Sequence, residues 1–222
     1  MKFDIAELQQ NFLLVANAEN AKSAEAYMKN QFKYFGIYTA ERRKISNDYI
    51  KKIGLLTNKE LQKIVKELWY QPYREFQYIA IELIAFHKKQ WTSAIIELTK
   101  FCLINKSWWD SVDAIASLIL SDYFKLFPHH IIPITSNWNT NNNFWLNRSS
   151  IMFQKNYKKN TDTVLLSKYI LNCNHSKEFF IQKAIGWALR EYSKTNPVWV
   201  MDFVANNELA PLSKREALRL IL

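Results

Sequence analysis

Apolar stretches along the chain are separated by polar residues of the kinds that begin α-helices. Two segments have the pattern of a capping box, Thr57-Asn-Lys-Glu60 and Ser213-Lys-Arg-Glu216. In this motif the first hydroxyl and the fourth side chain each accept a hydrogen bond from a free backbone N–H. Further helix starts are expected, by the usual capping preferences, at Asp4, Asn20, Thr39, Tyr73 after Pro72, Thr92, Ser107, Pro128, Asn142, Thr161, Ser176 and Pro197. The pattern predicts helices along the whole chain.

The expected helix starts form two interleaved series. One runs through positions 4, 39, 73, 107, 142, 176 and 213, and the other through 20, 57, 92, 128, 161 and 197, so that both repeat every 33 to 37 residues. Two helices per period of about 35 residues is typical of stacked helical hairpins. The signatures of TPR and ankyrin repeats are not evident, and HEAT-like repeats fit best. We therefore predict an all-α solenoid of about six HEAT-like antiparallel hairpins, forming a single domain over residues 1–222 and curved around a concave face.

The composition supports a helical fold. The 222 residues include only 3 glycines and 5 prolines, whereas the tight hairpins of β-rich domains need Gly or Asn at positive φ. Gly36, Gly54 and Gly186 also lie far apart, which excludes a glycine-rich loop that cradles phosphates.

Charge and cysteine usage limit the environment and the partners. The formal net charge of +10 favours an anionic partner such as nucleic acid. Cys102 and Cys173 lie in apolar helical stretches and are expected to be reduced, buried thiols. The start MKFDIAELQQ lacks the apolar run of a signal peptide, and no apolar stretch approaches the ~18 residues that span a membrane. We expect a cytoplasmic protein of bacterial type, associated with the nucleoid when bound to DNA, with no membrane partner.

The histidines do not predict a metal site. No Cys or acidic pair lies at zinc-binding spacing from His129 and His130, so neither a metal nor another cofactor is expected. His87 and His175 are expected at the surface or in loops.

The segment Lys106-Ser-Trp-Trp-Asp-Ser-Val-Asp113 carries the strongest candidate chemistry. Trp109 and Asp113 are four residues apart and therefore lie on one face of a helix. A core tryptophan beside an exposed aspartate, whose charge suits a helix start, would give the same spacing. Asp113 and Arg148 each lie six residues after an expected cap, which predicts similar positions on neighbouring helices. The same counting does not place Trp187 beside Asp113.

Long segments of the chain resemble the AlkD family of HEAT-like DNA glycosylases. They are Lys106-Ser-Trp-Trp-Asp-Ser-Val-Asp113, Trp145-Leu-Asn-Arg148, Lys177-Glu-Phe-Phe-Ile-Gln-Lys-Ala-Ile-Gly-Trp187-Ala-Leu-Arg190, Leu209-Ala-Pro-Leu-Ser-Lys-Arg-Glu-Ala217, Tyr27-Met-Lys-Asn30, Gly36-Ile-Tyr-Thr-Ala-Glu-Arg-Arg43, and Glu67 to Gln77. The resemblance covers nearly the whole chain.

The resemblance implies a DNA repair enzyme. Its activity would be excision of positively charged N3- and N7-alkylated purines from duplex DNA, without swinging the base into a pocket. The implied catalytic residues, which surround the sugar of the damaged nucleotide, are Trp109, Asp113 and Trp187. Arg148 would contact the DNA backbone, and Tyr27 would be a further aromatic residue beside the DNA.

These residue types suit that reaction. A cationic purine is a good leaving group, and positive charge moves to the deoxyribose as the glycosidic bond breaks. The Asp113 carboxylate can stabilise that charge and position a water, while tryptophan faces add cation–π stabilisation. No lysine is assigned to Schiff-base formation, so a monofunctional glycosylase that leaves an abasic site without cutting the strand is expected.

The concave face is expected to be basic and to bind double-stranded DNA that carries alkylated bases. Beyond Arg148 and Tyr27, the DNA-binding residues that we expect are Arg190, Arg43, Lys183 and Lys158. Other basic residues that fit this role are Arg42, Lys44, Arg74, Lys155, Lys159, Lys194, Lys214 and Arg215. Scattered basic residues that only solubilise outer faces would have the same composition. The alternatives are a non-catalytic relative that binds branched or distorted DNA and a protein-binding scaffold, and a monomer is expected.

Overall fold

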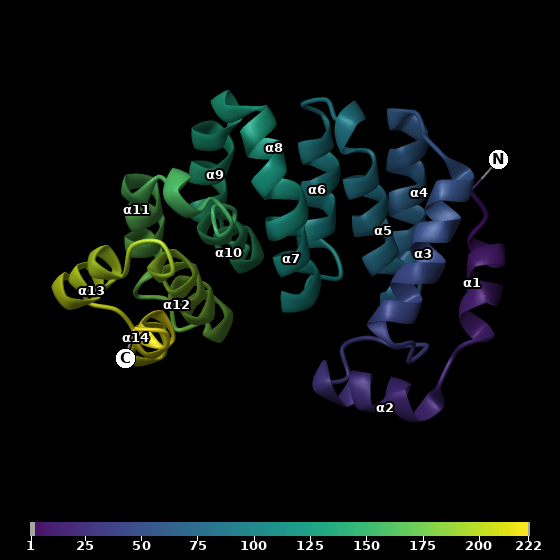
Figure 1. Ribbon diagram of the computed structural model, residues 1–222, viewed down its shortest axis with the longest axis horizontal. Coiled ribbons are helices and arrows are strands. Elements are labelled where there is room, and N and C mark those ends of the chain that lie inside the picture. The colour runs from purple at the N-terminus through teal and green to yellow at the C-terminus, as the bar shows by residue number, and fades with distance from the viewer. Residues whose placement is uncertain (1–2, 222) are drawn as a thin grey trace. The chain divides into compact units, whose positions relative to one another are not determined.

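The computed structural model describes residues 3–221, which form α-helices joined by short turns (Figure 1). Within these residues the β-structure is a single bridge between Lys33 and Tyr73. The prediction of an all-α fold is confirmed. The chain divides into two compact units, residues 1–95 and 96–222, and each is described by itself.

The described helices follow the two predicted series. The first series contains α1 (Ile5–Leu13), α3 (Thr39–Ile53), α5 (Arg74–Phe86), α7 (Trp109–Ile115), α10 (Phe144–Met152), α12 (Phe179–Ser193) and α14 (Pro211–Leu218). The second contains α2 (Ala18–Tyr27), α4 (Asn58–Tyr70), α6 (Ile95–Ile104), α9 (Ile131–Asn139), α11 (Thr163–Cys173) and α13 (Pro197–Asn206). A π-helical segment, Ala116–Leu120, joins α7 to α8 (Ser121–Leu126).

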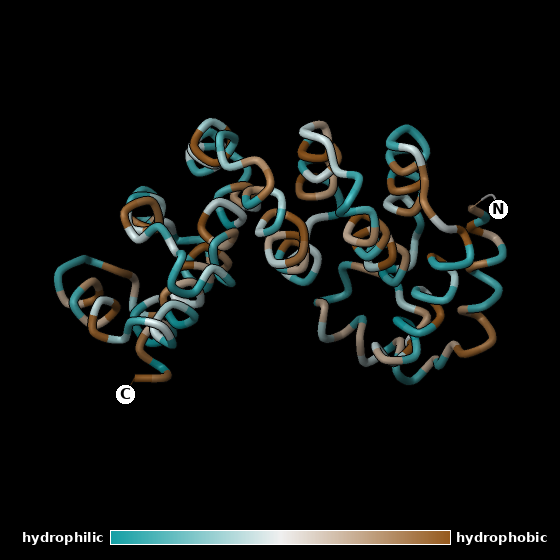
Figure 2. The backbone as a smooth tube through the Cα atoms, turned by 45° about the horizontal axis from the view of Figure 1, so that its top comes forward, coloured by the Kyte–Doolittle hydropathy of each residue, from teal (hydrophilic) through white to brown (hydrophobic). Residues whose placement is uncertain are grey.

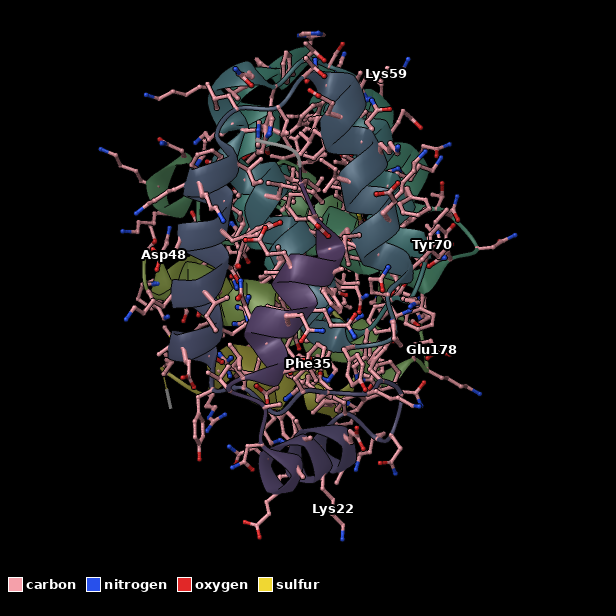
Figure 3. All side chains as sticks on the ribbon, turned by 90° about the vertical axis from the view of Figure 1, so that its right-hand side faces the viewer. Lys22, Phe35, Asp48, Lys59, Tyr70 and Glu178 are labelled. Atoms are coloured by element: carbon pink, nitrogen blue, oxygen red, sulfur yellow. The ribbon has the colours of Figure 1, made fainter. Side chains whose placement is uncertain are left out.

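Amphipathic helices build the core of each unit. Hydrophobic and hydrophilic residues alternate along successive helical turns in Figure 2, and helices of this kind bury one apolar face. In the first unit Leu8, Phe12, Trp69 and Phe76 are fully buried. Figure 3 shows exposed side chains, such as Lys22 of α2 and Lys59 of α4, extending away from the same unit.

The loop before α3 is fixed to α5 by a buried carboxylate. The backbone N–H of Gly36 donates to Oε1 of Glu75 at 3.1 Å, and the ring of Phe35 stacks on Tyr73 with centroids 3.9 Å apart. Burial raises the pKa of Glu75 above its usual range. Gly36 has a φ of +79°, and a Cβ there would overlap the carbonyl oxygen of Asn17, so this turn requires glycine.

One of the two predicted capping boxes is present. Thr57 and Glu60 make both reciprocal hydrogen bonds at the start of α4. The prediction that Ser213 caps a helix is wrong, because α14 begins two residues earlier at Pro211, whose fixed φ suits the first helical position. Ser213 is buried inside α14, and its hydroxyl donates to the carbonyl of Gln182 at 2.9 Å.

His87 also differs from expectation. It is buried rather than at the surface, and its Nε2 accepts a hydrogen bond from the backbone N–H of Leu56 at 2.9 Å. The start of α2 moves as well, since Asn17, and not Asn20, is its N-cap.

Candidate active site

A buried ion pair between α7 and α10 lies at the centre of the candidate site. Nε of Arg148 donates to Oδ1 of Asp113 at 2.8 Å, and Nη2 donates to Oδ2 at 2.9 Å. Asp113 is 8% exposed and Arg148 3% exposed. A bidentate pair of this kind fixes the plane of the carboxylate and orients both of its oxygens.

Equivalent positions on neighbouring helices bring these two side chains together. Asp113 is the fifth residue of α7 and Arg148 the fifth residue of α10, and the two helices pack against each other. The predicted proximity of Asp113 and Arg148 is therefore confirmed. The role implied for Arg148 fits this geometry less well, because its guanidinium is buried and bonded to Asp113 instead of facing solvent.

A cluster of aromatic side chains includes Phe180, whose backbone the ion pair contacts. Trp108, the N-cap of α7, contacts Trp145 with centroids 6.1 Å apart and the ring of Phe180 at 5.2 Å in an edge-on arrangement. The carbonyl of Phe180 accepts a hydrogen bond from Nη1 of Arg148. The indole N–H of Trp108 is buried with no hydrogen-bond partner among the described residues. The two charged residues are themselves nearly buried, and the interaction between their charges is stronger there than in water.

The tryptophans expected at the site lie on α7 and α12 of the same unit. Trp109 begins α7, one turn before Asp113, and Trp187 lies in the middle of α12, which packs against α10. Both indoles are partly buried. A cation is already present on one of them, since Nζ of Lys155 lies 3.9 Å from the ring centroid of Trp187.

Lys155 contacts Trp187 and interacts electrostatically with both residues of the ion pair. It lies in the turn after α10, where it is partly buried. Burial lowers the pKa of Lys155 below the usual lysine value, while the charges of Asp113 and Glu191 act in the opposite direction. Arg148 and Lys194 add smaller lowering effects. The charges of Asp113 and Arg148 therefore act on the pKa of Lys155 in opposite directions.

Two of the expected DNA-binding residues have a partner inside the protein. Nζ of Lys183 and Nη1 of Arg190, both on α12, contact Glu216 of α14 at 2.9 and 2.7 Å. The hydrogen bond from Lys183 is the main reason that the pKa of Glu216 is lowered. Lys158 is exposed and begins the short 3-10 helix Lys158–Asn160 that follows the turn of Lys155.

Tyr27 and Arg43 belong to the first unit, whereas Asp113 belongs to the second. Tyr27 ends α2 and is exposed, and it lines a cavity of about 350 Å³ together with Tyr34, Tyr38 and Glu75. Arg43 is exposed on α3, with its Nε 3.8 Å from Glu82.

Sequence reasoning missed three contributors to this region: Lys155, Phe180 and Glu216. Lys155 was only one of many basic residues, and no sequence signal distinguished it, because its contact with Trp187 depends on the path of a turn. Phe180 acts through its backbone carbonyl, which carries no side-chain signal. The sequence pattern predicts that Glu216 belongs to a capping box, whereas the basic residues at 183 and 190, one repeat earlier in the chain, are the signal for its ion pairs.

No cluster of metal-binding side chains is found within residues 3–221. No described helix is long and apolar enough to cross a membrane.

Known proteins share both the sequence pattern and the fold. The model of the family described as DNA alkylation repair enzyme matches residues 8–221. The chain belongs to this family. A solved structure described as a predicted DNA alkylation repair enzyme from Enterococcus faecalis is 34% identical, with a TM-score of 0.87 over 92% of this chain and 95% of that one.

A second solved structure has the same helical-repeat fold. AlkD2 from Streptococcus mutans is 15% identical, with a TM-score of 0.62 over 90% of this chain and 96% of that one. No curated protein matches the chain. The resemblance to the AlkD family is confirmed, and family membership assigns this protein a role in the repair of alkylated DNA.

Proposed function

We propose that this AlkD-family protein is a DNA glycosylase that hydrolyses the N-glycosidic bond of positively charged N3- and N7-alkylated purines in duplex DNA. The observation that carries the proposal is the nearly buried Asp113 carboxylate, which Arg148 holds by two hydrogen bonds of 2.8 and 2.9 Å. The reaction releases the damaged base and leaves an abasic site.

The fixed carboxylate suits the charge that develops in this reaction. An alkylated purine leaves as a neutral base, and the deoxyribose becomes an oxocarbenium-like cation. A carboxylate that is already oriented stabilises this cation without further reorganisation, and it can also accept a proton from the attacking water. Arg148 contributes by positioning Asp113, because its guanidinium is bonded to both carboxylate oxygens.

Aromatic faces provide the second source of stabilisation. Nζ of Lys155 lies 3.9 Å from the ring centroid of Trp187, and this contact supports a role for the ring in stabilising positive charge. Trp109 lies one turn before Asp113 on the same helix face. Each such contact contributes about 0.5–2 kcal/mol, depending on desolvation.

Specificity is attributed to the substrate's own charge rather than to a base-reading pocket. In this proposal the damaged base stays in the duplex, and an unmodified purine is spared because it is a poor leaving group.

DNA binding is attributed to the basic residues of both units. Lys158 and Arg43 are exposed, whereas Lys183 and Arg190 share Glu216 and would exchange this partner for phosphate or bind alongside it. Duplex DNA is the proposed partner and a monomer the proposed functional form.

The test is the release of free base from a duplex that contains a single N7-methylguanine. We expect chromatography to detect 7-methylguanine and an abasic strand, with no release of guanine from the matched unmodified duplex. Binding of the duplex without any base release would contradict the glycosylase and favour the non-catalytic DNA-binding alternative.

A further inference from the structure

The first unit contains a cavity of about 350 Å³ beside the turn that carries Gly36. This volume is within the range of small-molecule sites, roughly 300–1,000 Å³. Tyr38 is exposed, whereas Tyr34 and Glu75 are buried, so the cavity reaches from the surface into the unit. Aromatic side chains dominate its lining, since four of the lining residues are tyrosines: Tyr27, Tyr34, Tyr38 and Tyr78.

Glu75 brings a carboxylate with an unsatisfied oxygen to this cavity. It is 2% exposed and is one of the lining residues. Its Oε1 accepts the hydrogen bond from the backbone N–H of Gly36 at 3.1 Å, which fixes the position of the side chain. Its Oε2 is buried and has no hydrogen-bond partner in the part of the chain that the structure describes. A buried acceptor without a partner is costly, and an N–H group of a ligand would satisfy it.

The other charged residue of the lining, Arg42, is already neutralised. Its Nη1 and Nη2 donate to the two carboxylate oxygens of Glu82, both at 2.9 Å. The guanidinium carbon of Arg42 also lies 5.1 Å from the ring centroid of Tyr78, and tyrosine faces attract cations. Glu75 and the electron-rich rings therefore determine the charge preference of the cavity, and both favour a cation.

We propose that this cavity is a binding site for a small organic ammonium ion, whose N–H group bonds to Oε2 of Glu75 and whose apolar body packs against the tyrosine rings. An anion would be repelled by the carboxylate. A neutral molecule would form a weaker hydrogen bond, because bonds between two charged groups are roughly twice as strong as neutral ones. The site goes beyond the proposed glycosylase, which is built on Asp113 in the second unit.

Burial and ligand charge act on Glu75 in opposite directions. Burial is the largest effect on Glu75 and raises its pKa, while backbone hydrogen bonds lower it. An ammonium ion close to the carboxylate favours the ionised form. Binding of the cation and ionisation of Glu75 should therefore support each other.

The experiment uses nuclear magnetic resonance of the whole protein, labelled with ¹⁵N-glycine. The chain has three glycines, Gly36, Gly54 and Gly186, so the spectrum contains three backbone amide signals. The Gly36 amide reports on the site directly, because it donates to Glu75. Millimolar benzylammonium is the probe, and we expect it to shift the Gly36 signal in a saturable way while the other two signals stay in place.

Benzyl alcohol and benzoate are the matched ligand controls. They keep the benzyl or phenyl ring and replace the ammonium by a neutral or a negative group. We expect benzyl alcohol to bind at least about tenfold more weakly than benzylammonium and benzoate not to shift Gly36. Equal affinity of benzyl alcohol and benzylammonium would overturn the proposal of a cation site.

Two variants and one control locate the ligand. Glu75→Gln keeps an acceptor for Gly36 but removes the charge, and Tyr38→Ala removes an exposed ring of the lining. Both should weaken benzylammonium binding, the first by at least about tenfold. Tyr70→Ala removes an equally exposed tyrosine of the same unit outside the cavity and should bind as the wild type does. Tyr38→Ala and the ligand controls decide the question even where Glu75→Gln fails to fold.

The remaining outcomes also decide. No shift of Gly36 with benzylammonium, or similar shifts of all three glycine signals, would overturn the site, since the second result indicates nonspecific binding. Wild-type affinity in Glu75→Gln would overturn the role of the carboxylate. None of these measurements involves DNA, so their failure leaves the glycosylase proposal untouched, and failure of base release leaves this site untouched.

Discussion

Arg148 and Asp113 depend on each other because both are nearly buried. Removing two charges from water is costly, and the cost is offset only where the geometry of the pair is good and the remaining hydrogen-bonding groups are satisfied. Here both carboxylate oxygens are bonded to the guanidinium, and a third bond from Arg148 reaches the carbonyl of Phe180. Removal of one partner leaves the other as an uncompensated buried charge.

Arg148→Gln should therefore be strongly destabilising. Without the guanidinium, the Asp113 carboxylate remains buried and unpaired, and breaking a buried pair in this way costs about 3–5 kcal/mol. Urea unfolding followed by circular dichroism measures the change in the free energy of unfolding.

The matched control is the double variant Asp113→Asn with Arg148→Gln. Once both charges are absent, the loss should be clearly smaller than the sum of the two single variants. A strictly additive result would mean that the two residues do not stabilise each other.

The proximity of Asp113 and Arg148 could be predicted from the sequence, because it depends only on the position that each residue has in its helix. A repeat of about 35 residues places equivalent positions of neighbouring helices side by side, and counting from an approximate cap was sufficient. Lys155 and Phe180 were not predictable in this way. The contact of Lys155 depends on the path of the turn that follows α10. Phe180 contributes a backbone carbonyl, whose direction is set by the fold and not by the residue type.

At the scale of elements, α12 and α14 approach closely at Gly186. A Cβ at this position would lie 2.5 Å from Cβ of Glu216 and 2.9 Å from the carbonyl oxygen of Ser213. Glu216 then reaches Lys183 and Arg190 from α14. The absence of a side chain at Gly186 is what allows these ion pairs to form beside α12.

Gly186→Ala should destabilise the protein even though alanine is the better helix former. The added methyl group forces α12 and α14 apart, and overpacking of this kind costs about 1–3 kcal/mol. Thermal unfolding should show a lower Tm for Gly186→Ala. Lys194→Ala, at the exposed end of the same helix, should change stability by less than about 0.5 kcal/mol, and an equally small effect of Gly186→Ala would contradict the close approach.

Glu216 predicts a pH dependence of stability. Its pKa is lowered in the folded protein by Lys183 and then by Arg190, so the folded state holds its proton less tightly than the unfolded chain. The stabilisation is present above the ordinary carboxyl pKa, near 4.5, and is lost as the pH falls through the lower folded value.

The measurement is Tm between pH 7 and pH 3 for wild type and Glu216→Gln. The variant should start with a lower Tm at pH 7 and should lose less of it on acidification. Glu178→Gln, which changes an exposed carboxylate at the start of α12, should follow the wild-type curve. A Glu216→Gln curve parallel to wild type would show that this carboxylate does not couple the two helices.

The number and spacing of the helices could be predicted from the sequence, but not every helix boundary could. The period and the two series were predictable because capping residues recur in every repeat. The start of α14 was not, since Pro211 and Ser213 both carry start signals and only packing against α12 distinguishes them. In a capping box, the side chains of Ser213 and Glu216 would bond to the backbone at the start of their own helix. In the structure they bond to α12 instead.

At the scale of the whole molecule, the net charge of +10 favours the binding of DNA. Intramolecular pairs engage part of this charge, as Glu216 and Glu82 do with their basic neighbours. The remaining exposed basic residues, among them Lys158, are available to phosphates.

DNA affinity should fall steeply with salt. Each neutralised phosphate releases counterions and contributes roughly 0.9 to the slope of log K against log salt, so about six contacts predict a slope near −5. Fluorescence anisotropy with an unmodified duplex measures this slope, and Lys158→Ala should reduce it by about one if that residue contacts a phosphate. A nearly flat response would contradict binding through basic residues.

The most direct test of the central claim is the single-turnover rate of 7-methylguanine release by wild type and by Asp113→Asn on the same duplex. Asparagine keeps the size of the side chain but cannot stabilise the sugar cation or accept a proton from water. The account predicts a rate about 10²–10⁴-fold lower for the variant, with duplex binding largely retained, at a temperature where circular dichroism shows the variant, which leaves Arg148 unpaired, to be folded. Equal rates for the two proteins would contradict a catalytic role for Asp113.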